Sequence, residues 1–299
     1  MTWIGVGMFV GRIGLILVSA DMSLLPLRAV ASDLETIKPG KLIVAFNGDM
    51  PGTSWQNGKL IGLDGELVQW IADQLGLKVE PALMEWSGEV ASVTSGRADL
   101  MVGMMGWTVP RTQVMLLSDP LYYAGTRINQ KKTSDIHTIQ GLEGKRIAVM
   151  TGTAAVNDYK KISGTELKLF DTLDAAVRAL LDGRVDVASV DAAAVQYGIK
   201  QNPQWDMKQL SLDESYNPNF PVITNKWNVV LGLRKEAPNL AKAIDEKIAA
   251  AWANCLNRET AAKYGLGEGW WFTPPNVNAR ANVDRAADWK QPELAPSCR

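Results

Sequence analysis

The chain has 299 residues, a length that corresponds to about two ordinary domains. Apolar residues make up 46% and charged residues 21%, with a formal net charge of −1, which argues against a disordered chain, a coiled coil and a basic nucleic-acid-binding surface. One His and two Cys leave little material for a metal site, and the mature sequence has no phosphate-binding glycine loop. We therefore expect no cofactor, no metal ion and no nucleic-acid partner.

The first 31 residues resemble a secretory signal peptide. An apolar run, Ile13–Ala20, follows Arg12, and small residues in an A-x-A pattern end at Ala31. Asp21 and Arg28 interrupt the apolar stretch, so we do not expect a transmembrane helix. A buried N-terminal helix is the alternative. Cleavage after Ala31 would leave the mature protein in the periplasm.

The rest of the chain alternates between strand and helix patterns. In chain order we predict strand Lys41–Phe46, helix Glu66–Leu75, strand Lys78–Met84, helix Gly88–Thr94, strand Leu100–Gly103, strand Arg146–Met150, a helix beginning at Ala154–Tyr159, strand Leu167–Phe170, helix Leu173–Leu181, strand Val185–Val190, strand Asn228–Leu233, helix Pro238–Asn254 and helix Arg258–Tyr264. Such alternation predicts an α/β fold with two parallel-type sheets and right-handed crossovers.

Three ordered segments carry a resemblance to a known family. They are GKLIGLD at Gly58–Asp64, GMMGWTVPRTQVMLLSDP at Gly103–Pro120, and LEGKRIAVMTGT at Leu142–Thr153 together with VDVASVD at Val185–Asp191. In order and spacing they resemble the polar amino-acid family of periplasmic solute-binding proteins, the soluble receptors of ABC importers.

The resemblance implies a type II periplasmic-binding fold, in which two α/β lobes are joined by two crossing strands like a Venus flytrap. Lobe 1 would comprise residues 32–125 and 228–299, including the C-terminal tail, and lobe 2 residues 126–227. The implied function is a soluble periplasmic receptor, without enzymatic activity and monomeric. It would bind an amino acid or a similar zwitterion, with an aromatic or cationic side chain, and deliver it to the importer permease.

Arg111 and Asp191 match the residues that hold the solute's charged groups in this family. The planar guanidinium of Arg111 suits a carboxylate, although pairing with Asp119 is an alternative. Asp191 matches the acceptor of the α-ammonium group, although an Asp after a strand is often a helix N-cap. The turn Gly152 and Thr153 matches a backbone site for the carboxylate, with an N-cap by Thr153 as the plainer reading.

Aromatic and small residues complete the expected site. Trp86 and Trp107 would form a wall for the solute, against the alternative of core packing. The other residues expected there are Asn47, Asp49, Met104 and Gly106. Gly106 and Ala154 stand where the family has hydroxyl residues. The loss of hydroxyls and the extra acid at Asp49 suggest a bulkier or cationic ligand.

Two other functions remain open from the sequence. A cyclohexadienyl-dehydratase-like enzyme on the same scaffold would need a carboxylic acid, for which Asp49, Asp213 and Glu214 are the candidates. A sensor that acts in trans on a membrane receptor is the other. Separately, Cys255 and Cys298 both survive cleavage, and an oxidising compartment favours a disulfide over two free thiols.

Overall fold

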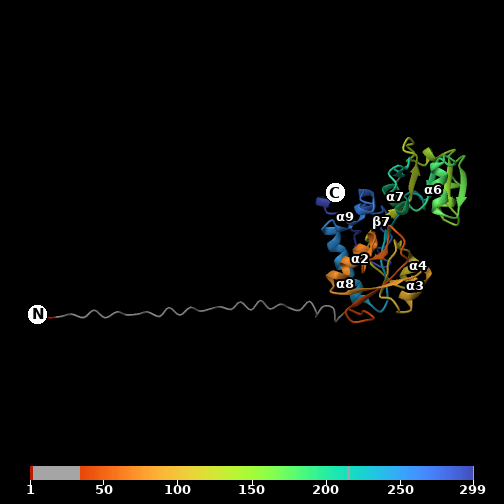
Figure 1. Cartoon of the computed structure of the whole chain (residues 1–299). Helices are drawn as coiled ribbons and strands as arrows, with labels where there is room; N and C mark the ends of the chain where they lie inside the picture. Colours follow the sequence, from red (N-terminus) through yellow and green to blue (C-terminus); the bar gives the residue numbers. More distant parts are fainter. Residues whose placement is uncertain (3–33, 214–215, 299) are drawn as a thin grey trace.

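The computed structural model describes residues 1–2, 34–213 and 216–298. The predicted signal peptide and its cleavage site therefore lie outside the described residues, apart from Met1 and Thr2. The chain forms two lobes, each built on its own five-stranded sheet. Figure 1 shows α6 and α7 in one lobe, α2, α3, α4 and α8 in the other, and β7 at their junction. No helix within the described ranges is long and apolar enough to cross a bilayer.

The first sheet is parallel on one side and antiparallel on the other. Its strand order is β4-β1-β5-β14-β6, with bounds Lys78–Leu83, Lys41–Phe46, Leu100–Met101, Gly232–Leu233 and Leu116–Leu117. β1 pairs in parallel with β4 and β5, whereas β14 is antiparallel to β5 and β6. A short hairpin of β2 (Ser54–Gln56) and β3 (Lys59–Ile61) precedes the first helix.

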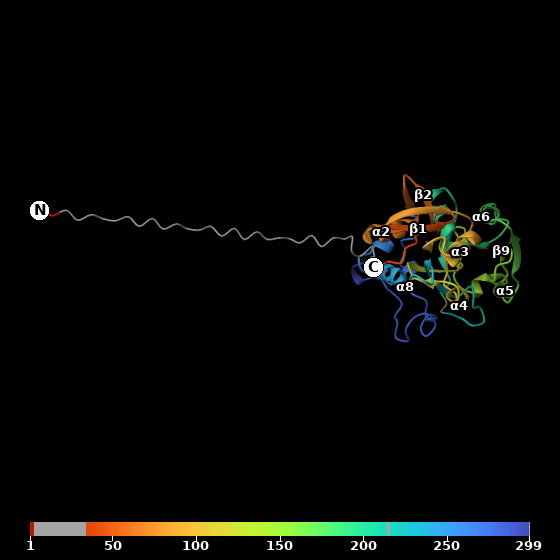
Figure 2. The ribbon, with the colours of Figure 1, turned by 90° about the horizontal axis from the view of Figure 1, so that it is seen from below.

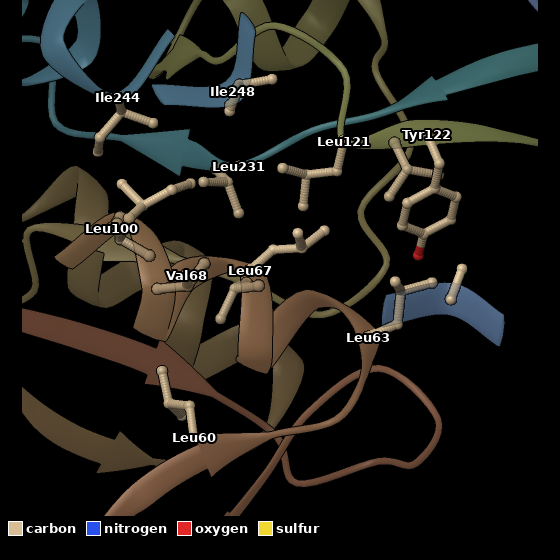
Figure 3. Close-up of a cluster of buried hydrophobic side chains, with 14 of the residues drawn as sticks. Leu60, Leu63, Leu67, Val68, Leu100, Leu121, Tyr122, Leu231, Ile244 and Ile248 are labelled. Carbon is tan, nitrogen blue, oxygen red and sulfur yellow. The ribbon is translucent and has the colours of Figure 1, made fainter. Parts of the chain in front are cut away.

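Helices cover this sheet because their apolar residues recur on one side. α2 spans Leu63–Gln74 and buries Leu63, Leu67, Val68 and Ile71. Figure 3 shows Leu67 and Val68 close to Leu231 and Leu100, so that α2 packs against strands from distant parts of the chain. Each such buried leucine contributes about 1.5–3 kcal/mol. The other helices of this lobe are α3 (Trp86–Thr94), α4 (Val109–Thr112), α8 (Pro238–Ala253) and α9 (Leu256–Lys263).

The second sheet repeats this plan. Its strand order is β10-β9-β11-β8-β12, with bounds Glu166–Phe170, Arg146–Met150, Val187–Ser189, Arg127–Gln130 and Lys208–Ser211. β9 is parallel to β10 and β11, and β8 is antiparallel to β11 and β12. The helical elements of this segment are η1 (Gln140–Leu142), α5 (Ala155–Tyr159), α6 (Leu173–Leu181) and α7 (Ala192–Gln201). The expectation of parallel sheets therefore holds for the three strands at one side of each sheet, β4-β1-β5 and β10-β9-β11, and is wrong for the pairings at the other side.

Two antiparallel strands, β7 (Tyr122–Gly125) and β13 (Lys226–Val229), connect the lobes. The prediction of one strand over Asn228–Leu233 is wrong in detail, because this stretch contributes to two sheets. Val230 and Leu231 link β13 to β14. The Val230 N–H donates to the Met105 carbonyl and the Leu231 N–H donates to Ser118 Oγ, each at 2.9 Å. The chain thus leaves the crossing strands and enters the first sheet as β14.

The C-terminal tail is fastened to the first lobe. The predicted disulfide between Cys255 and Cys298 is confirmed and closes a sequence separation of 43 residues. Arg280 is fully buried and donates to the Ser118 carbonyl at 2.8 Å, and Arg285 pairs with Asp119 at 2.8 Å. Figure 2 shows the blue C-terminal segment looping out beside α8. Its helical turns are η2 (Gly269–Phe272) and η3 (Pro296–Cys298).

Candidate ligand-binding site

Residues of both lobes and of the crossing strands line a cavity of about 360 Å³. Met104 contributes to it from the first lobe, Thr153 and Asp191 from the second, and Trp227 from β13. Three of the predicted binding residues are therefore brought together at one cavity between the lobes. The remaining predicted residues are not part of this lining, and their positions are described next.

Buried Asp64 sets the position of Met104. Its carboxylate accepts hydrogen bonds from the Met104 N–H at 2.6 Å and from the Tyr122 hydroxyl at 2.9 Å. Met104 has φ of 54°, in the left-handed region, and such a conformation needs support from its surroundings. Burial raises the pKa of Asp64 to about 6. Asp64, the last residue of the GKLIGLD motif, is thus buried inside the lobe and holds the backbone of Met104, a residue of the cavity lining.

Arg111 is half-buried on the first lobe and lies over the ring of Trp86. Its guanidinium carbon is 5.4 Å from the centre of the Trp86 ring, and it donates a hydrogen bond to the Gly106 carbonyl. Burial lowers the pKa of Arg111 from its usual value. The alternative of a pair with Asp119 is wrong, because Arg285 of the tail occupies that carboxylate.

Asp191 caps a helix and also faces the cavity. As the N-cap of α7, its Oδ1 accepts the Ala194 N–H at 2.7 Å. The side chain is exposed and lines the cavity, so Oδ2 remains available for another donor. Both readings of this residue are therefore compatible, since capping uses one oxygen.

Gly152 and Thr153 form an exposed turn after β9. Gly152 has φ of 76°, a conformation that favours glycine. The Thr153 hydroxyl donates to the Met150 carbonyl at 3.0 Å, and the N-cap of α5 is Ala154 with no side-chain cap. The alternative of an N-cap by Thr153 is therefore wrong, because its hydroxyl closes the preceding turn instead.

Trp227 explains why position 106 is a glycine. A Cβ on Gly106 would lie 3.0 Å from Cδ1 and 3.2 Å from Nε1 of the Trp227 indole. Gly106 also forms a bridge with Val229, beside the crossing strands. The indole thus occupies the space into which a hydroxyl residue would project. Trp227 was not predicted as a site residue. The high Trp content of the sequence indicated that some tryptophans have a special role, but it did not identify Trp227 as one of them.

Asn47 and Asp49 belong to the loop after β1. The Asn47 amide donates to Asp49 Oδ2 at 2.6 Å, and Asp49 is exposed. Trp107 lies elsewhere on this lobe, with its ring 5.9 Å from the guanidinium of buried Arg280. The structure therefore does not place Trp107 against Trp86 as a second wall, and it packs toward the tail.

Glu89 was not predicted from the sequence. It lies one turn into α3 and is 0% exposed, and burial together with the charge of Asp49 raises its pKa to about 8. Its only sequence signal was an acidic residue on the buried side of a short helix. Of the candidate acids for an enzyme, Asp213 lies 3.5 Å from His137, and Glu214 is outside the described residues.

Comparison with known proteins agrees with this architecture. The profile of the bacterial extracellular solute-binding proteins, family 3, matches residues 42–267. A probable histidine-binding protein of Campylobacter jejuni is 28% identical over 188 residues, which cover 62% of this chain and 73% of that protein. The histidine-binding periplasmic protein of Escherichia coli is 25% identical over 215 residues, covering 69% of this chain and 80% of that protein.

Solved structures show the same fold. An ancestral arginine-binding protein bound to arginine aligns with a TM-score of 0.54 at 27% identity, covering 75% of this chain and 98% of that one. The L-cystine solute receptor of Neisseria gonorrhoeae, in the unliganded open conformation, aligns with a TM-score of 0.65 at 23% identity, covering 78% and 96%. The expected type II periplasmic-binding fold, a Venus flytrap of two lobes, is confirmed. The chain belongs to the bacterial extracellular solute-binding proteins, family 3.

Proposed function

We propose that this protein is a periplasmic receptor that binds one amino acid between its lobes and delivers it to the permease of an ABC importer. The observation that carries the proposal is the state of Arg111. This guanidinium is half-buried over Trp86, and none of the ion pairs among the described residues includes it. A guanidinium in that setting gains a charge-assisted, two-pronged partner when a carboxylate binds.

Asp191 supplies the opposite charge from the second lobe. Its Oδ1 is used by the α7 N-cap, and its Oδ2 can accept the α-ammonium group of the solute. A zwitterion held by Arg111 and Asp191 would contact both lobes only when they approach each other. Binding would therefore stabilise the closed arrangement by its differential contacts.

The rest of the predicted site fits the same role. Met104, Thr153 and the turn at Gly152 would surround the solute at the cavity, with Trp86 beside its side chain. Residues 126–227 would move as one lobe against residues 32–125 and 228–299. The curated relatives are named as binding proteins, which supports a receptor without enzymatic activity. The relative named as periplasmic supports that location for the mature chain.

A thermal-shift screen of the twenty amino acids, followed by calorimetry, tests the proposal. Bound ligand raises the melting temperature by mass action. We expect at least one amino acid to bind residues 32–299, and Arg111→Met to weaken it by tenfold or more. Arg97→Met is the matched control, because Arg97 is an exposed arginine of the same lobe. Equal binding by both variants and the wild type would contradict the assigned role of Arg111, and no binding of any amino acid would contradict the function.

A further inference from the structure

Helix α7 of the second lobe is also packed against the first lobe. Ala192 and Ala193, at its start, belong to the large buried cluster of the first lobe, whereas Val195 belongs to a cluster of the second. Asp191, the N-cap of α7, lines the cavity between the lobes. The helix that carries a proposed ligand residue is thus seated between the two lobes.

At the other end of α7, the Lys200 ammonium group joins the lobes. It donates hydrogen bonds to the Ala262 carbonyl at 2.7 Å and to the Lys263 carbonyl at 2.6 Å, both in the last turn of α9. A cation is favoured there, because the final carbonyls of a helix carry a partial negative charge. Gly265 permits the close approach, since it has φ of 87° and a Cβ placed on it would lie 3.3 Å from Lys200 Cβ. Lys200 therefore caps a helix of the opposite lobe.

The end of α9 is fixed to the first lobe. The hydroxyl of Tyr264, directly after the helix, accepts the Gly62 N–H at 2.9 Å and donates to Glu66 Oε1 at 2.5 Å. Lys263 pairs with the other carboxylate oxygen of Glu66 at 2.6 Å. The carbonyls that Lys200 binds are therefore held by α2 and move with the first lobe.

The contact of Lys200 and the proposed ligand residue Arg111 lie on opposite sides of a crossing strand. Figure 1 shows α9 on one side of β7 and α4, which carries Arg111, on the other. α7 packs against β7, and its nine residues from Asp191 to Lys200 extend over about 13 Å at 1.5 Å per residue. A rotation of the second lobe about the crossing strands that brings Asp191 toward Arg111 therefore carries Lys200 away from α9.

A second pair between the lobes lies much closer to the crossing strands. Arg127 begins β8, two residues after β7 ends at Gly125, and its guanidinium pairs with Glu268 at 2.6 Å. A rotation displaces a group near its axis less than a group at the far end of α7. The contact of Lys200 is therefore more sensitive to lobe movement than this pair.

We propose that Lys200 and the carbonyls of Ala262 and Lys263 form a latch that holds the lobes apart in the ligand-free protein. This inference rests on the proposed receptor function, in which closure brings Arg111 to a cavity whose lining it does not join in the present arrangement. Binding has to break the latch. The latch therefore lowers the apparent affinity for the solute, because it reduces the fraction of protein in the closed arrangement.

Removal of the latch should tighten binding. Lys200→Met keeps most of the apolar side chain and removes the ammonium group. We expect it to bind about twofold to fivefold more tightly those of the twenty amino acids that bind the wild type. Lys200→Arg retains a cationic donor and should bind them as the wild type does. Lys132→Met is the matched control, because Lys132 is exposed and donates to the Pro203 carbonyl within the second lobe, at 3.5 Å. Calorimetry on residues 32–299 gives these affinities.

A covalent latch should have the opposite effect. The 3.3 Å between Lys200 Cβ and the ideal Cβ position on Gly265 is close to the separation that a disulfide spans. The double variant Lys200→Cys with Gly265→Cys, when oxidised, should bind about tenfold or more weakly than when reduced. In small-angle X-ray scattering, a bound amino acid should reduce the radius of gyration of the wild type and leave that of the oxidised variant unchanged. The wild type in the same reductant controls for loss of the Cys255–Cys298 bond.

Failure of the latch can be distinguished from failure of the proposed function. The latch is contradicted if Lys200→Met binds amino acids with the wild-type affinity or more weakly, or if Lys132→Met gains as much affinity as Lys200→Met. It is also contradicted if the oxidised double variant binds as tightly as its reduced form. In each of these cases amino acids bind and the receptor function stands. If none of the twenty amino acids binds the wild type, the proposed function falls and the latch falls with it.

Discussion

The guanidinium carbon of Arg111 lies 5.4 Å from the centre of the Trp86 ring. A Cβ placed on Gly103 would lie 3.7 Å from the same ring and 3.8 Å from Glu89 Oε2. Among the residues that the structure describes, Arg111 forms no ion pair and neither carboxyl oxygen of Glu89 has a hydrogen-bond partner. A solute carboxylate would give the Arg111 guanidinium a charge-assisted partner beside this ring.

Burial of Glu89 should make the stability of the unliganded protein depend on pH. Its pKa rises from 4.5 to about 8 on folding, so the folded protein holds a proton that the unfolded chain releases between these values. Stability should therefore fall as pH rises from about 4.5 to about 8, after which this loss is complete.

Glu89→Gln isolates this contribution. The stability of Glu89→Gln minus that of the wild type should grow across this window by at most about 1.4 kcal/mol per pH unit. Urea unfolding of both proteins at pH 5, 6.5 and 8 measures the difference. A difference that stays constant with pH would show that Glu89 titrates normally.

Asp64 should stabilise the first lobe through two hydrogen bonds. Asp64→Ala leaves the Met104 N–H and the buried Tyr122 hydroxyl without their acceptor, and we expect a loss of about 3 kcal/mol in unfolding free energy. Tyr122→Phe removes one of the two bonds and should cost about 1 kcal/mol. Equal unfolding midpoints in urea for Asp64→Ala and the wild type would show that the bonds contribute nothing.

Gly106→Ala should disturb Trp227. The added Cβ would lie 3.0 Å from the rigid indole of Trp227, a residue of the crossing strand β13. We expect a loss of about 1–2 kcal/mol and a changed tryptophan fluorescence spectrum. Gly269→Ala is the control, because a Cβ there would meet nothing within 4 Å. Identical effects of the two substitutions would contradict the assigned contact.

Removal of the disulfide should loosen the tail. Replacement of Cys255 and Cys298 by Ser opens a loop with a sequence separation of 43 residues, worth up to about 4 kcal/mol in the chain-entropy account. Reductant should lower the unfolding free energy of the wild type by a similar amount, seen as a lower unfolding midpoint. It should leave the unfolding free energy of the double variant unchanged. A reductant effect of equal size on both proteins would indicate a cause other than this bond.

Much of the fold could be predicted because its elements carry strong local patterns. The strands Lys41–Phe46 and Arg146–Met150 have the predicted bounds, since each is a short apolar run between polar residues. The division of Asn228–Leu233 between two sheets could not be predicted. It depends on Met105 and Ser118, which lie far away in the sequence.

The site was predicted less completely. Asp191, Met104 and Thr153 line one cavity, whereas the other predicted residues lie outside its lining. Glu89 was missed because α3 has only nine residues, so its buried side is poorly defined by periodicity. The contact of Arg280 with the Ser118 carbonyl joins residues 162 positions apart, and no local pattern encodes it.

The most direct test of the account compares an amino acid that binds with the amine that lacks its carboxylate. Calorimetry on the wild type and on Arg111→Met gives four affinities. We predict that the amino acid binds the wild type at least tenfold more tightly than it binds the variant, and that the amine binds both proteins equally weakly. An amino acid that binds wild type and variant with the same affinity would contradict the claim that Arg111 holds its carboxylate.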